Sequence, residues 1–343
     1  MVSMGNWARR AASGAAMMAL ALLAACGGGT EQITPFAPTR MWALGDDMSV
    51  MTDTLPLGRK YSINAISTTD TTQLDCVTLP LWHQPVAYTW AFAYPECNPT
   101  NNPVTAARIF AQAGAKVADM PTQLAAARLV AGREFSNTDL FTLLVGANDV
   151  IEVYQTIYLA DPTTNGYNAG LAELTRRGVR LAAFVNELTR ANVGDIYGPK
   201  IVLSTIPLMN LTPYAIQEAV NRPGLDVLNV LYQFSTAFNT ALRAGDQQNN
   251  FSGIVNDGRF IGLIELDALL GSPNGIANNP GGYGVINTLQ AACTVPLPDC
   301  TQNTLVSTAN SANYLWASDL WMGPTAHLNL GNFARGRALG NPF

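Results

Sequence analysis

Short apolar runs alternate along the chain with longer segments whose apolar residues recur at helical spacing. The clearest run, residues 139–145, is almost uninterrupted, as in a strand that is covered on both faces of its sheet. Further strands are predicted at 41–45, within 106–117, at 200–206 and at 259–266, and helices at 120–132, 168–191, 225–244 and 325–339. Residues 278–293, rich in glycine and asparagine, indicate a loop. Strands that alternate with long helices predict an α/β protein, a three-layer α/β/α sandwich around a parallel, doubly wound sheet.

Composition narrows the class of protein. The 343 residues are 48% hydrophobic and 13% charged, which suits one large globular domain and argues against disorder. A net charge of −5 at pH 7 argues against nucleic acid as a partner. The sequence contains no nucleotide-binding loop and no metal-ligand cluster, so we expect neither a cofactor nor a metal.

Residues 1–25 have the pattern of an export signal. Arg9 and Arg10 precede an apolar run of small residues that is shorter than the roughly 20 residues of a comfortable membrane span. The run ends in Leu-Ala-Ala-Cys and resembles a bacterial lipobox, which implies that Cys26 becomes the lipidated first residue of the mature protein. The alternative is an ordinary secretory signal in which Cys26 has no such role.

The rest of the chain divides into two parts on this interpretation. Residues 26–40 form the lipidated cysteine and a flexible, glycine-rich tether, and residues 41–343 form the folded domain. The position after Cys26 holds no aspartate that would retain a lipoprotein in the inner membrane. We therefore expect the protein in the bacterial cell envelope, attached by its lipid to the outer membrane.

Four further cysteines lie in the predicted domain: Cys76, Cys97, Cys293 and Cys300. Export to an oxidising compartment favours disulfides, and four cysteines permit three pairings. The simplest pairing joins nearest neighbours, Cys76 with Cys97 and Cys293 with Cys300. Zinc ligation is the competing interpretation, but the sequence has no CxxC motif and only two histidines, His83 and His327.

Three turns follow three of the predicted strands, at residues 45–47, 113–115 and 146–149. In a doubly wound sheet such turns meet at one carboxyl edge, where ligands bind. The first turn presents Asp47 from a strand–turn–helix segment. The N–H of Gly114 and the side-chain amide of Asn148 supply donors at the same edge, which predicts an oxyanion hole.

This arrangement resembles the SGNH (GDSL-type) ester hydrolases, and the resemblance covers nearly the whole mature chain. That family has Gly-Asp-Ser-Leu at the first turn, a glycine at the second, Gly-x-Asn-Asp at the third and Asp-x-x-His near the C-terminus. The likeness to exported lipoprotein members includes residues 114–117, residues 146–149 and Tyr283-Gly284 before Cys293. It implies a flavodoxin-like, SGNH-type sheet and an ancestry in lipase- or esterase-like hydrolysis.

The chain departs from this family at all three catalytic positions. Asp47 stands where the family has its nucleophilic serine, Ser318 where it has the acid and Trp321 where it has the histidine base. The C-terminal alignment rests on Trp316, Pro324 and His327.

No neighbouring residue restores the machinery in the sequence. Ser49 lies two residues beyond Asp47 and does not replace the nucleophile without a rebuilt turn. His327 matches a second, non-catalytic histidine of the family, and a register shifted to Asp319 still lacks a histidine.

Two functional hypotheses follow. The first is a catalytically degenerate protein that binds an acyl or glycan ester, or acts as an envelope interaction module. The second is an active carboxylic-ester hydrolase in which Asp47 acts as a carboxylate nucleophile. A third interpretation limits the likeness to the fold, with Gly114 and Asn148 kept only because the turns need them. On the first hypothesis, we expect Asp47 to point at the donors of Gly114 and Asn148, and Trp321 to cover the same cleft.

Overall fold

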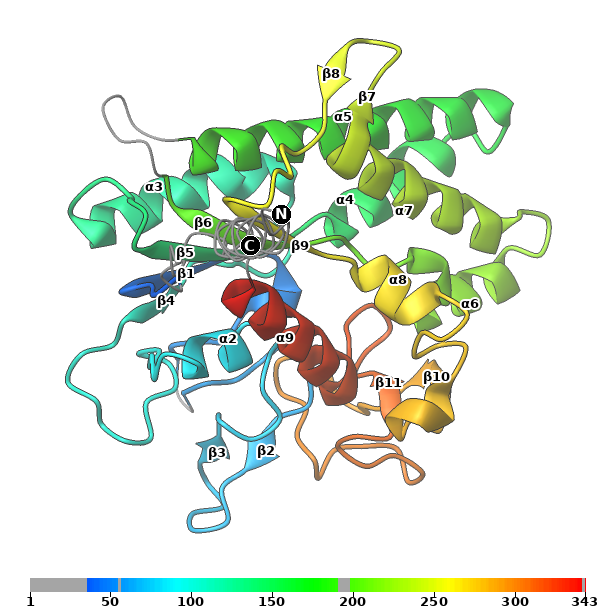
Figure 1. Ribbon diagram of the computed structural model, residues 1–343. Helices are drawn as coiled ribbons and strands as arrows, with labels where there is room; N and C mark the ends of the chain where they lie inside the picture. The colour runs from blue at the N-terminus through cyan, green and yellow to red at the C-terminus, as the bar shows by residue number, and fades with distance from the viewer. Residues whose placement is uncertain (1–35, 55–56, 191–197, 341–342) are drawn as a thin grey trace, which may run out of the picture. The chain divides into compact units, whose positions relative to one another are not determined.

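The computed structural model of the protein describes residues 36–54, 57–190, 198–340 and 343. Its centre is a sheet of five parallel strands in the order β4-β1-β5-β6-β9 (Figure 1). The strands are β1 (Arg40–Gly45), β4 (Ala107–Ile109), β5 (Asp139–Leu144), β6 (Lys200–Ser204) and β9 (Ile261–Ile264). The sheet confirms the predicted α/β class, and its order is that of a doubly wound, flavodoxin-like sheet.

Strand β5 lies in the middle of the sheet, paired with β1 on one side and β6 on the other. All six of its residues are buried, which explains why its apolar run is almost continuous. The register pairs Gly45 with Leu144, so β1 and β5 end level with each other. The turns that follow these two strands therefore start at the same height on the carboxyl edge.

Helices cover both faces of the sheet, as Figure 1 shows. One face carries α3 (Met120–Ala131), α5 (Thr164–Thr189) and α7 (Val227–Ala244), and the other carries α2 (Gln84–Tyr88) and α9 (Pro324–Leu339). Helices α5 and α7 approach closely at Gly178, where a Cβ atom would lie 2.4 Å from the Phe238 carbonyl oxygen. The three layers are those predicted from the alternation of strands and helices.

Some elements differ from the prediction. Helices α6 (Pro213–Asn221) and α8 (Leu266–Gly271) have no counterpart in it. The segment expected to be a loop contains β10 (Asn287–Ala291), which pairs in parallel with β11 (Tyr314–Trp316). The shorter elements are α4 (Ala147–Val153), β2 (Ala65–Ile66), β3 (Leu74–Asp75), β7 (Gly245–Asp246) and β8 (Phe251–Ser252).

Both predicted disulfides are confirmed. Cys76 bonds to Cys97 with their Cα atoms 5.6 Å apart, and Cys293 bonds to Cys300 with 5.9 Å between Cα atoms. The zinc interpretation of these four cysteines is therefore wrong, because a sulfur in a disulfide is not a thiolate ligand.

The predicted signal peptide and Cys26 lie outside the described residues, as does the tether up to residue 35. Residues 36–343 form one compact unit. Within the described part of the chain, no helix is both long and apolar enough to cross a membrane.

Candidate active site

The first turn is shaped by Gly45 at the end of β1. Its φ is +139°, and a Cβ atom there would lie 2.2 Å from the Leu144 carbonyl oxygen, so no other residue fits without a shift of the backbone. Asp46 then caps the short 3₁₀ turn Asp47–Ser49 by accepting a hydrogen bond from Met48 N at 3.2 Å. This geometry fixes the direction in which Asp47 leaves the sheet edge.

Asp47 meets the two predicted donors. Its Oδ2 accepts a hydrogen bond from Gly114 N at 2.7 Å and another from Asn148 Nδ2 at 2.9 Å. The φ of Gly114 is +74°, a conformation that glycine adopts without strain. The structure thus brings together three residues that are 67 and 101 positions apart in the chain. Their assignment as nucleophile position and oxyanion hole stays a prediction.

The donors are themselves held in place. Asn148 Nδ2 also donates to Ala115 O at 3.1 Å, which joins the second turn to the third. Asp149 adds a second connection, because its Oδ2 accepts from Val117 N at 3.0 Å and its Oδ1 from Arg177 Nη1 at 3.0 Å. The two donors that face Asp47 are therefore fixed by contacts outside the first turn.

Asp46 and Asp47 are adjacent carboxyl groups in different surroundings. Asp46 is fully buried, and this burial, together with the charge of Asp47, raises the pKa of Asp46 well above its usual range. Asp47 is 5% exposed and accepts two N–H hydrogen bonds. Asp46 therefore holds its proton more readily than an ordinary aspartate does, and Asp47 is the member of the pair that meets the two donors.

Tyr61 is a neighbour of Asp47 that the sequence did not identify. Partial burial, and next the negative charge of Asp47, raise the pKa of the Tyr61 phenol above its usual value. Its backbone N–H donates to Val50 O at 3.4 Å, beside the first turn. No motif marks this tyrosine, because its place depends on how residues after the first turn fold back over it.

The C-terminal positions form a tight turn of their own. Ser318 Oγ accepts a hydrogen bond from Trp321 N at 3.2 Å, and Trp321 O accepts one from Ala317 N at 2.8 Å. Met322 O accepts from Ser62 Oγ at 2.9 Å, which places the turn next to the segment that carries Tyr61. Within the described residues, Ser318 forms no hydrogen bond with Asp47. The position of the Trp321 indole, which is 9% exposed, over Asp47 stays a prediction.

Neither Ser49 nor the histidines supply a substitute mechanism. Ser49 is fully buried; its Oγ accepts from Trp82 Nε1 at 3.0 Å, and its carbonyl oxygen pairs with His83 Nε2 at 3.2 Å. His327 is also fully buried, and neither of its ring nitrogens has a hydrogen-bond partner among the described residues. No general base is therefore within hydrogen-bond reach of Asp47 in the part of the chain that the structure describes.

A metal would need a different arrangement. Over the described ranges, no group of three or more His, Cys, Asp or Glu side chains is placed to hold a metal ion.

Comparison with known proteins gives similarity of structure but not of sequence. No family model matches the chain, and no curated protein matches it. Among solved structures, the lipase Lip_vut3 from a goat rumen metagenome aligns over 89% of this chain and 99% of its own, with 11% identity and a TM-score of 0.46. The acetylxylan esterase Axe2 from Geobacillus stearothermophilus aligns over 90% of this chain and 97% of its own, with 12% identity and a TM-score of 0.40. At these identities and TM-scores, the similarities carry no information about the reaction.

Proposed function

We propose that this protein is a lipid-anchored component of the bacterial cell envelope, on the outer membrane, that keeps an ester-hydrolase fold without hydrolysing esters. The observation that supports this proposal is the position of Asp47 Oδ2, 2.7 Å from Gly114 N and 2.9 Å from Asn148 Nδ2. In an ester hydrolase, donors of this kind stabilise the negative oxygen of the tetrahedral intermediate. Here a permanent carboxylate already satisfies them, so an ester carbonyl that approaches finds both donors occupied.

The lack of a base supports the same proposal. A serine hydrolase loses roughly a million-fold in turnover when its catalytic triad is removed. This chain has no serine at position 47 and no histidine at position 321, and both of its histidines are fully buried without a hydrogen bond to Asp47 among the described residues. Among the residues that the structure describes, Asp47 has no partner to deprotonate water for the breakdown of a covalent intermediate.

Of the two ligand classes, we propose that the site binds a glycan or glycan ester rather than an acyl chain. No described residue donates a hydrogen bond to Asp47 Oδ1, so this oxygen is a free acceptor. The partly exposed phenol of Tyr61 lies close to the same carboxylate. Sugar hydroxyls are donors that suit a carboxylate acceptor, and the apolar body and polar tip of a tyrosine suit a sugar ring.

The deciding experiment compares turnover of a short-chain aryl ester by the purified wild type and by the Asp47→Ala variant. We expect both rates to equal that of the control variant Asp257→Ala, which removes an exposed carboxylate elsewhere. Turnover that the wild type and the control share, but that Asp47→Ala loses, would instead establish an active hydrolase with a carboxylate nucleophile.

A further inference from the structure

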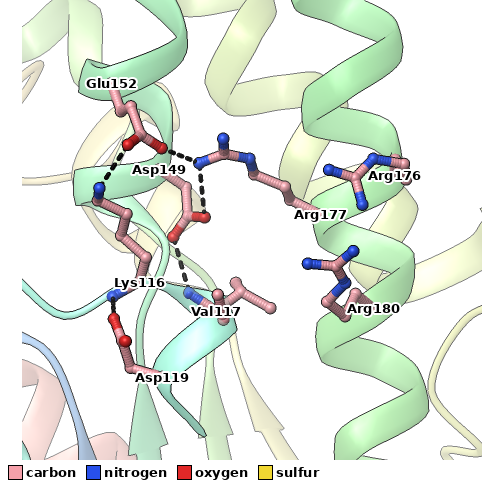
Figure 2. A pocket seen from close by; sticks show the side chains of 9 residues that line it. Lys116, Val117, Asp119, Asp149, Glu152, Arg176, Arg177 and Arg180 are labelled. Carbon is pink, nitrogen blue, oxygen red and sulfur yellow. Dashed lines mark hydrogen bonds and ion pairs between the residues drawn. The ribbon is translucent and has the colours of Figure 1, made fainter.

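A cavity of about 240 Å³, whose lining Figure 2 shows, does not include Asp47, Gly114 or Asn148 among its lining residues. Lys116 and Asp149, two of its lining residues, follow Gly114 and Asn148 closely in the chain, and three arginines of α5 form the opposite side. Its charged lining residues are Lys116, Asp119, Asp149, Glu152, Arg176, Arg177 and Arg180. Four cationic side chains therefore face three carboxylates, in a chain whose net charge is negative.

One part of this lining is internally paired. Arg177 contacts Asp149 at 3.0 Å, Glu152 at 2.5 Å and Glu173 at 2.7 Å. Lys116 Nζ contacts the other oxygen of Glu152 at 2.5 Å. These ion pairs, drawn in part in Figure 2, join α5 to α4 and to the turn after Gly114. They account for the two buried or half-buried carboxylates at this wall, while Arg176 pairs with Glu173 and Arg180 has no carboxylate partner among the described residues.

Arg176 and Arg180 are lining cations that still have N–H donors without a partner among the described residues. Arg176 uses two of its nitrogens on Glu173, at 2.8 and 2.6 Å, and keeps its other N–H groups free. Arg180 forms no hydrogen bond or ion pair with any described residue, although it lines the cavity. The two are four residues apart on one helix, a spacing at which like charges repel each other. An anion between them removes this repulsion and uses donors that the fold leaves idle.

We propose that this cavity binds a small tetrahedral oxyanion, phosphate or a phosphate monoester, between the guanidinium groups of Arg176 and Arg180. A guanidinium presents paired N–H donors that match the oxygens of a phosphate. The cavity volume suits such a group and does not suit a long chain. This site is independent of the proposed function at Asp47, because it shares no residue with it.

The proposal is tested by calorimetric titration of the full purified protein with inorganic phosphate at low ionic strength. We expect saturable binding to the wild type and binding weaker by about tenfold or more in Arg180→Gln, the effect of losing a charged hydrogen-bond donor. Arg335→Gln is the matched control, because Arg335 is also exposed, helical and without an ion pair among the described residues. We expect this control to bind phosphate like the wild type.

A comparison of inorganic phosphate with a phosphate monoester shows which of the two forms the cavity prefers. Tighter binding of a phosphate monoester than of inorganic phosphate points to an esterified ligand, and binding of inorganic phosphate that is at least as tight points to the free ion. The proposal is wrong if the wild type shows no saturable binding of either compound, or if Arg180→Gln and Arg335→Gln weaken binding equally. Equal loss would mean that net charge, and not this cavity, attracts the anion.

Discussion

At the scale of single residues, the unusual feature is a carboxylate in the position where an ester hydrolase binds developing negative charge. Asp47 satisfies Gly114 N and Asn148 Nδ2, while burial, and next the charge of Asp47, raise the pKa of its neighbour Asp46. A serine side chain at position 47 would leave both donors free for a substrate. On the proposed function, the aspartate at position 47 gives the site an anion of its own in place of the transient anion of a substrate.

This interpretation predicts how activity can and cannot be restored. Asp47→Ser alone should leave ester hydrolysis near the wild-type background, because no base activates the new hydroxyl. The triple variant Asp47→Ser, Ser318→Asp, Trp321→His should exceed it by at least about a hundredfold, the usual contribution of a general base. Aspartate also suits position 318, since Ser318 Oγ already accepts a hydrogen bond from Trp321 N.

The measurement is steady-state turnover of a short-chain aryl ester by each variant. If Asp47→Ser by itself hydrolyses the ester far faster than the wild type, an unrecognised base is present and the degenerate interpretation is wrong.

At the scale of elements, two disulfides close loops outside the central sheet. Their sequence separations are 21 residues for Cys76–Cys97 and 7 residues for Cys293–Cys300. From the entropy of loop closure, replacing each pair by serines should lower the free energy of unfolding by about 3 and about 2 kcal/mol, respectively. Urea unfolding of the wild type and the two double variants checks this order. In the presence of a reductant, the three proteins should have similar free energies of unfolding. A larger loss for the shorter loop would contradict the loop-closure account.

The contact between α2 and α9 encloses two buried histidines. His327 lies on α9 and His83 immediately precedes α2, and both are fully buried. Burial lowers the pKa of each to about 3, with the charge of Lys60 acting in the same direction. His327 has no hydrogen-bond partner among the described residues, whereas His83 contacts Tyr94 Oη at 2.8 Å and Ser49 O at 3.2 Å.

The lowered pKa values of these two histidines predict that the free energy of unfolding depends on pH. Between pH 3 and the ordinary histidine pKa of about 6.5, the two histidines bind more protons in the unfolded chain than in the folded one, so their contribution to stability falls as the pH falls. His327→Leu should reduce this slope by up to about 1.4 kcal/mol per pH unit, because one buried histidine no longer titrates. At pH 7 it should unfold no more easily than the wild type, since it removes unpaired buried nitrogens.

The measurement is the free energy of unfolding in urea at pH 7 and pH 5. His83→Leu is the contrasting variant and should be less stable than the wild type at pH 7, because the Tyr94 hydroxyl and the Ser49 carbonyl oxygen lose their bonds to the imidazole. Equal pH slopes for His327→Leu and the wild type would show that His327 is not protonated on unfolding in this range.

The sequence predicted the sheet well because each central strand carries its own signal. The apolar run of β5 identifies a strand buried on both faces, and α3 ends at Gly132, whose φ is +64°, as the pattern indicated. The turns after β1, β4 and β5 were found because glycine and acidic or amide residues follow apolar runs. Helix α8 was missed because Leu266–Gly271 is too short to show helical periodicity.

The candidate site was only partly predictable, for a physical reason. Asp47, Gly114 and Asn148 meet because parallel strands bring their carboxyl ends to one edge, and this rule needs no knowledge of side-chain packing. The proximity of Tyr61, and the pairing of Ser318 with Trp321 in a turn of its own, depend on loops that no periodic pattern describes. The same holds for the cavity at Arg180, which forms only when α5 packs beside the second turn.

At the scale of the whole molecule, a folded domain with a polar site follows an N-terminal segment on which we expect a lipid. The domain spans residues 36–343, and Cys26 precedes it within residues that the structure does not describe. Within the described residues, no helix is suited to cross a bilayer. We propose that a lipid on Cys26 attaches the protein to the membrane, and this attribution rests on the pattern of the N-terminal sequence.

This attribution predicts that Cys26→Ser moves the protein from the membrane fraction to the soluble exported fraction. Each buried CH₂ of a lipid chain contributes about 0.8 kcal/mol, so the loss of the modified thiol removes the whole hydrophobic anchor. The matched control is Gly28→Ala, which changes the tether and keeps the cysteine, and which should stay in the membrane fraction. The measurement is the amount of each variant in the membrane and soluble fractions of cells that express it. Both disulfides should be present in the soluble protein if the released domain is folded. If Cys26→Ser stays with the membrane as the wild type does, the domain itself binds the membrane surface or an uncleaved signal holds it, and the lipoprotein assignment fails.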